Sequence, residues 1–77
     1  MNLQEQIIQI IAKELRLKPE VVVPTADLKE DLGVDILDAL ETVVALEDAF
    51  KIVYPADTHK DIHTVQDVID VTVRLIK

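Results

Sequence analysis

The sequence predicts an all-α fold, a small four-helix bundle of three main helices and one short helix, with a long loop between the first two. Apolar residues recur at helical spacing in three separate segments. Each segment follows a residue type that commonly caps helices. The one β-branched run, Val21–Val23, is followed at once by Pro24 and has no partner strand elsewhere. A sheet is therefore not expected.

The first helix is expected from about Leu3 to Arg16. Asn2 is placed to cap its first turn, and Glu5 follows three residues later, as in a capping box. The spacing of the apolar residues defines one face of this helix. That face comprises Leu3, Ile7, Ile8, Ile11 and Leu15.

Residues 17–34 are expected to form a long ordered loop. Val21, Val23, Leu28 and Leu32 would hold this loop against the core. Loops of this length are uncommon in small domains and often have a function. Gly33 is the only glycine in the chain. We expect it to supply either a positive φ or a close approach of the backbone.

The central helix is expected to begin after Asp35, which acts as its N-cap. Asp38 follows three residues later at the same end of the helix, and the helix continues through Phe50. The next chain break is Tyr54–Pro55, where Pro55 suits the first position of a short third helix that reaches about residue 61.

The last helix is expected to begin after Thr64, with Asp67 at the third helical position behind this cap. Its apolar stripe comprises Val65, Val68, Ile69, Thr72 and Ile76. These elements enclose one aliphatic core, so residues 1–77 are expected to be a single domain.

Composition excludes several classes of function. The chain of 77 residues has no cysteine, so disulfides and thiolate metal sites are excluded, and a reducing cytoplasmic setting is expected. Its formal net charge is −7, from 15 acidic and 8 basic residues. This charge disfavours nucleic acid and anionic membranes and favours a basic protein surface as partner. No serine or cysteine nucleophile and no glycine-rich phosphate loop is present, so an enzyme is not expected.

The exposed side of the central helix is expected to be acidic. At about 100° per residue, Asp38, Glu41, Ala45 and Asp48 share one narrow arc, and Leu37 and Val44 border it. No Lys or Arg occurs between Glu30 and Lys51 to relieve this charge. Four apolar residues further round the helix are expected to face the core: Leu40, Val43, Leu46 and Phe50. Glu47 lies on their side, where it could bond the next loop or the third helix, or contact a partner.

With these residues placed, the chain resembles an acyl carrier protein of the fatty-acid synthesis type. The segment DLGVDILDALETVVALEDAF is similar to the family pattern D-L-G-x-D-S-L-D followed by an acidic helix that ends in L-E-x-x-F. Residues 1–17 resemble the family's first helix, Ile52–Pro55 its I-x-I-P turn, and Thr64–Ile69 its T-V-x-D-x-I helix start. The resemblance covers nearly the whole chain.

The resemblance implies a prosthetic group that this chain cannot attach. In the family, a transferase esterifies the serine of D-S-L with 4′-phosphopantetheine, and acyl chains ride on that arm and can enter the helical core. Ile36 stands in place of this serine, and the sequence contains no serine at all. The chain as written is therefore expected to stay apo, without a cofactor.

The resemblance also implies the partners and the residues that contact them. Basic surfaces of fatty-acid synthesis enzymes and of the phosphopantetheinyl transferase would bind a monomeric carrier. The implied partner-facing or helix-framing residues are Asp35, Leu37, Asp38, Glu41, Val44, Glu47 and Asp48. Metal sites are expected to be weak at most. Loose divalent-cation binding at Glu30, Asp35 and Asp38 would relieve charge repulsion, and His59 and His63 lack a third strong ligand.

Two alternatives remain at the level of sequence. The chain could be an interaction module that docks on biosynthetic enzymes as a decoy or an assembly subunit. It could also be a stabilised or engineered bundle that has the carrier fold without a carrier role. The lack of serine, the many Ile and Val residues and the clean helix caps motivate the second alternative, in which Ile36 would raise stability if it packs.

Overall fold

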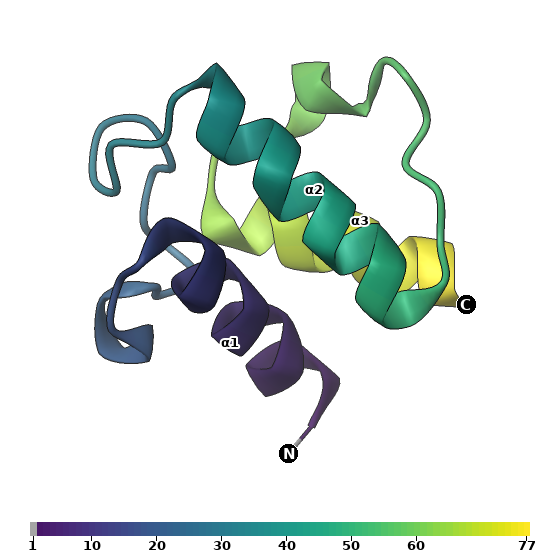
Figure 1. Cartoon of the computed structure of the whole chain (residues 1–77), viewed down its shortest axis with the longest axis horizontal. Helices are drawn as coiled ribbons and strands as arrows, with labels where there is room; N and C mark the ends of the chain where they lie inside the picture. The colour runs from purple at the N-terminus through teal and green to yellow at the C-terminus, as the bar shows by residue number, and fades with distance from the viewer. Residues whose placement is uncertain (1) are drawn as a thin grey trace.

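The computed structural model describes residues 2–77, and in this range it is all-α, as the sequence predicts. Three α-helices, α1 (Leu3–Leu15), α2 (Ile36–Phe50) and α3 (Val65–Ile76), surround the core (Figure 1). Two short 3₁₀ helices, η1 (Pro19–Val21) and η2 (Thr58–Asp61), lie in the connections. None of the helices in residues 2–77 is both long and apolar enough to cross a bilayer.

The start of α1 is confirmed, and its end is one residue earlier than predicted. The side chain of Asn2 accepts a hydrogen bond from the backbone N–H of Glu5 at 2.8 Å. Arg16 has φ 59° and lies outside the helix as its C-cap. The N–H of Leu17 then turns back to the carbonyl of Ala12 at 2.9 Å. This left-handed residue satisfies carbonyls of the last turn and stops the helix.

The predicted caps of α2 and α3 are both present as capping boxes. In α2, the Asp35 carboxylate accepts from the N–H of Asp38 at 2.8 Å, and the Asp38 carboxylate accepts from the N–H of Asp35 at 3.3 Å. In α3, Thr64 and Asp67 exchange the corresponding bonds at 3.2 and 3.0 Å. Each box satisfies two N–H groups that a helix start leaves without partners.

The predicted short third helix is present and ends at Asp61, but its predicted start at Pro55 is wrong. Pro55 lies in the preceding loop, and only Thr58–Asp61 is helical, as a 3₁₀ turn. The carbonyl of Pro55 accepts from the N–H of Thr58 at 3.1 Å. Bonds between residues three apart produce the tighter 3₁₀ geometry, which rarely extends beyond one turn.

The loop of residues 17–34 is ordered, but different residues hold it against the core than those predicted. Val22 and Ala26 are buried, whereas Val21 and Val23 are exposed. The reason is η1, because a 3₁₀ turn changes which side chain of the valine run points inward. Two other predicted contacts are confirmed, since Leu28 and Leu32 pack against the core.

Gly33 has the positive φ that the sequence suggested, at 68°. A side chain at this position would meet no atom within 4 Å, so close approach of the backbone is not the reason for glycine. The neighbouring N–H groups of Gly33 and Val34 donate to the carbonyls of Lys29 and Leu28 at 3.2 and 2.9 Å. The loop therefore closes on itself immediately before α2.

Aliphatic side chains fill the core, and α1 packs against both α2 and α3. The largest fully buried side chains are Ile7, Ile11, Val22, Leu46, Val65 and Thr72. Leu46 of α2 belongs to the same buried cluster as Val65, Val68 and Ile69 of α3. Ile76 is exposed, contrary to the predicted stripe, because it is the last residue of α3.

Candidate functional site

The N-terminus of α2 presents an unusual side chain. Ile36 is the first residue of the helix and is 81% exposed. An isoleucine side chain has no oxygen or nitrogen, so it offers neither a nucleophile nor a hydrogen bond. An exposed branched aliphatic side chain at this position is suited only to apolar contact.

Ile36 is the first member of an apolar stripe along the exposed side of α2. We define the docking stripe as Ile36, Leu37, Leu40 and Val44, of which the last three are 64%, 58% and 61% exposed. The prediction that Leu40 faces the core is wrong. At helical spacing Leu40 lies between Ile36 and Val44, whereas α2 turns Thr42 and Leu46 inward.

Acidic residues lie along one flank of the docking stripe. Glu41 and Asp48 are exposed, and Asp48 has only a long, highly exposed ion pair with Lys51 at 3.9 Å. Such a pair contributes little stability. Asp38 is half-buried and belongs to the capping box, as does Asp35. Glu41 and Asp48 are therefore the acids of α2 most available to a partner.

Glu47 is held by the chain itself. Its carboxylate accepts a hydrogen bond from the backbone N–H of Tyr54 at 2.8 Å. This confirms the predicted bond to the next loop and gives Glu47 a structural role.

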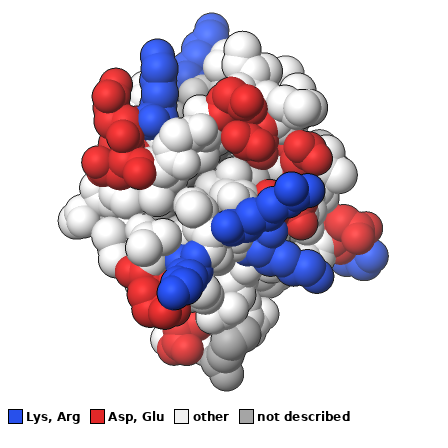
Figure 2. All heavy atoms as spheres, turned by 60° about the vertical axis from the view of Figure 1, so that its left-hand side comes forward, with Lys and Arg blue, Asp and Glu red and all other residues white. Residues whose placement is uncertain are grey.

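The charges are distributed unevenly along the chain. Residues 1–29 contain four basic and four acidic residues, whereas residues 30–77 contain four basic and eleven acidic ones. Both signs are interspersed on the face shown in Figure 2. The whole net negative charge therefore comes from the part of the chain that includes α2 and α3.

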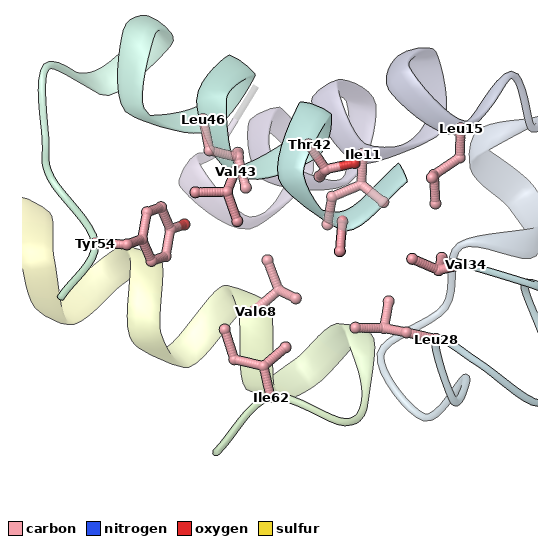
Figure 3. A pocket seen from close by; sticks show the side chains of 11 residues that line it. Ile11, Leu15, Leu28, Val34, Thr42, Val43, Leu46, Tyr54, Ile62 and Val68 are labelled. Carbon is pink, nitrogen blue, oxygen red and sulfur yellow. The ribbon is translucent and has the colours of Figure 1, made fainter. Parts of the chain in front are cut away.

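A small cavity of about 60 Å³ lies between α2 and α3 (Figure 3). Its lining is aliphatic apart from Thr42 and Tyr54. The lining residues are Ile11, Leu15, Leu28, Val34, Ala39, Thr42, Val43, Leu46, Tyr54, Ile62 and Val68. Sequence patterns did not reveal this set, because it draws on all three α-helices and on both connecting segments.

Tyr54 has the hydroxyl partner that its burial requires, which is Thr72. The hydroxyl of Thr72 donates to the carbonyl of Val68 at 2.7 Å. Because that bond uses the only hydroxyl proton of Thr72, the Tyr54 hydroxyl is the donor to Thr72. Burial raises the pKa of Tyr54, and the nearby charge of Glu47 adds to this rise.

The structure does not bring together the residues that were considered as cation ligands. Within residues 2–77, no three His, Cys, Asp or Glu side chains are grouped so that they could hold a metal ion. Glu30, Asp35 and Asp38 are included in this result, as are His59 and His63. The carboxylates of Asp35 and Asp38 instead bond each other's backbone N–H groups.

Comparison with known proteins gives consistent matches. A family model described as a phosphopantetheine attachment site matches residues 5–71. An acyl carrier protein of Syntrophobacter fumaroxidans is 41% identical over 68 residues, which cover 88% of this chain and 84% of that protein. One from Thermosynechococcus vestitus is 42% identical over 66 residues, covering 86% and 82%.

A solved structure shows the same fold. The solution structure of an apo doublet acyl carrier protein from prodigiosin biosynthesis superposes with a TM-score of 0.80 and 26% identity. The match covers 94% of this chain and 35% of the doublet. From its sequence relatives and its fold, this chain belongs to the acyl carrier protein family, whose members are carriers and not enzymes.

Proposed function

We propose that this chain is an apo member of the family that docks on enzymes of fatty-acid biosynthesis without carrying a prosthetic arm. The observation that carries the proposal is Ile36, which is 81% exposed at the first position of α2. By resemblance to the D-S-L pattern, this is the place of the attachment serine. The position is accessible, but its side chain has no oxygen to attack a phosphoanhydride.

None of the threonine hydroxyls lies at the start of α2. Thr25 lies in the loop that precedes α2, and Thr58 is the first residue of η2. Thr42 and Thr72 are buried, and each donates its hydroxyl proton to a backbone carbonyl of its own helix. Thr64 caps α3. The last three threonines have structural roles, which supports an apo chain with no 4′-phosphopantetheine.

The docking stripe and its acidic flank support the choice of partner. An apolar patch beside Glu41 and Asp48 complements an apolar groove with a basic rim. Among enzymes that bind carriers, the phosphopantetheinyl transferase and the fatty-acid synthesis enzymes are the proposed partners, in the cytoplasm, with the chain as a monomer. Ile36 would lengthen the apolar contact where relatives carry the arm.

The exposure of Ile36 gives no support to a role in stabilising the bundle. In the alternative of a stabilised bundle, Ile36 would raise stability if it packed. A side chain that is 81% exposed removes little apolar surface from water and contributes little to the core. The exposed position fits a contact with another molecule better.

Loading is tested with a broad-specificity phosphopantetheinyl transferase and coenzyme A, followed by intact-mass measurement. We expect no mass gain for the wild-type chain and a gain of one phosphopantetheinyl group for Ile36→Ser. A wild-type chain that gains this mass would contradict the apo proposal. A Ser variant that gains none would contradict the assignment of position 36.

Docking is tested by the binding of the apo chain to the same transferase at several salt concentrations. We expect binding that weakens as salt rises. Glu41→Lys should weaken it roughly tenfold, whereas Asp70→Lys, an equal charge change on α3, should have a much smaller effect. Ile36→Ala should also weaken binding, with the exposed Val53→Ala as its control. Equal effects of Glu41→Lys and Asp70→Lys would refute docking through α2.

A further inference from the structure

Lys51 ends the acidic flank of the docking stripe with a positive charge. It is the C-cap of α2 and the only Lys or Arg between residues 30 and 59. Its ammonium nitrogen lies 3.9 Å from a carboxylate oxygen of Asp48, and the two side chains are 84% and 86% exposed. A basic surface that spans α2 from Glu41 to Asp48 therefore meets a cation at the C-terminal end of the helix.

The backbone that carries Lys51 is held by Glu47. Lys51 has φ 56°, and its N–H donates to the carbonyl of Glu47, as does the N–H of Ile52 at 3.2 Å. The carboxylate of Glu47 accepts from the N–H of Tyr54 at 2.8 Å. Three backbone N–H groups of the segment after α2 are thus bonded to one residue. The chain therefore leaves the helix along one path, and Lys51 has a fixed place beside Asp48.

The pair of Lys51 and Asp48 matters more for docking than for folding. A long ion pair between two exposed side chains contributes little to stability. When a partner covers α2 and removes water, the charges at this end of the helix interact more strongly. A basic group of the partner then has to share the Asp48 carboxylate with Lys51, and the two cations repel each other. Both effects weaken docking at this end of α2.

Glu41 is too far from Lys51 to be strongly affected in the same way. The two residues are ten positions apart, which corresponds to about 15 Å along a helix. This distance exceeds the Debye length of about 10 Å at 0.1 M salt, beyond which exposed charges are largely screened. The effect of Lys51 is therefore local to Asp48.

We propose that Lys51 attenuates the docking of basic partner surfaces on α2 by competing for Asp48 and repelling the cations of the partner. The proposal rests on the docking function above and deepens it, because it names a residue that sets how tightly a partner is held. Partners with a carboxylate or an apolar group opposite Lys51 are favoured over partners whose basic rim continues to this end of α2. Lys51 is thus a specificity-determining residue.

The test measures the affinity of the apo chain for the broad-specificity phosphopantetheinyl transferase at low salt. We expect Lys51→Gln to strengthen binding by about threefold. Lys18→Gln is the matched control, because it removes the same charge at the N-cap of η1. Figure 1 shows η1 on the opposite side of the molecule from the C-terminal end of α2. The control should therefore change the affinity much less.

A double-mutant cycle locates the effect on the surface. The gain from Lys51→Gln should disappear in an Asp48→Asn background and persist in a Glu41→Gln background. A more stable fold would not explain the gain. A cation at the C-terminal end of a helix is favourable, so Lys51→Gln should lower the melting temperature while it strengthens binding.

Three results would overturn the proposal. These are equal effects of Lys51→Gln and Lys18→Gln, weaker binding by Lys51→Gln, and a gain that remains in the Asp48→Asn background. Glu41→Lys tests the docking function separately. If Glu41→Lys weakens binding while Lys51→Gln changes nothing, docking through α2 stands and only the role of Lys51 is refuted.

Discussion

Gly33 shows how one residue can fix the entry of the chain into a helix. Its φ of 68° lies in the left-handed region, where a Cβ is unfavourable, and two residues later Asp35 caps α2. No atom within 4 Å would obstruct a side chain. Conformation, and not close packing, therefore favours glycine at this position.

We predict that Gly33→Ala lowers the free energy of unfolding by about 1 kcal/mol, because an alanine is strained in the left-handed conformation. Gly33→Asn should lower the free energy of unfolding less than Gly33→Ala does, since asparagine tolerates this conformation better than alanine. Urea denaturation followed by circular dichroism measures both. An alanine variant as stable as the wild type would show that the loop accommodates another φ.

Tyr54 gives a second prediction at this scale. Because the folded pKa lies above 10.0, the folded state favours the neutral phenol. The contribution of this group to stability is full below pH 10 and is lost as the pH rises through the raised pKa. Tyr54 is the only tyrosine, so ultraviolet absorbance of the tyrosinate reports it alone.

We expect the pKa of Tyr54 in the folded chain to be higher than its pKa in denaturant. We also expect Tyr54→Phe to lose stability less steeply than the wild type between pH 10 and pH 12. Identical slopes for the two chains would contradict the assignment, since the lysines that titrate in this range are common to both.

At the scale of elements, the start of α3 depends on Asp67. Its carboxylate accepts from the N–H groups of His63 and Thr64 at 2.8 and 3.0 Å. These backbone bonds lower the pKa of Asp67. They are favourable to the carboxylate and are weakened when it is protonated.

We predict that Asp67→Asn destabilises the chain by up to about 1 kcal/mol at pH 7. The stability from Asp67 is present above pH 3.8 and is lost as the pH falls through the lowered pKa. The variant should therefore show a smaller loss of stability in acid. Thermal unfolding between pH 2 and pH 7 measures this, with Asp70→Asn on the same helix as control. A control that behaves like Asp67→Asn would indicate a general charge effect.

The docking stripe is likewise a property of an element, because it depends on which side of α2 the rest of the chain covers. Thr42 and Leu46 of α2 are buried in the core. The opposite side of the helix is therefore exposed, with the four residues of the docking stripe on it. Four large apolar side chains on one exposed helix face are typical of a binding surface. Burying them in a partner would favour association.

At the scale of the molecule, the net charge of −7 opposes folding and is concentrated after residue 29. We predict that Glu41→Gln raises the melting temperature by about 1–3 °C at low salt, because it relieves repulsion along α2. The gain should fall in about 0.5 M salt, where screening is strong. Lys51→Gln removes a positive charge and should act in the opposite direction. A gain that is independent of salt would exclude an electrostatic cause.

The sequence by itself determined the three α-helices, their N-caps and the acidic character of α2. Spacing, capping residues and the single glycine are local features, and local interactions fix them. The absence of a hydroxyl at Ile36 was equally plain, since it depends on residue identity alone.

Only the tertiary structure decided which side chains are covered. Leu40 has the same apolar character as Val43, yet it is exposed because α1 and the core occupy the other side of α2. Val22 is buried, whereas Val21 and Val23 are exposed, because the 3₁₀ turn of η1 changes which valine side chain points toward the core. The bonds of Tyr54 to Glu47 and Thr72 join segments distant in sequence. Periodicity describes one helix at a time, whereas burial and cavities depend on how several elements meet.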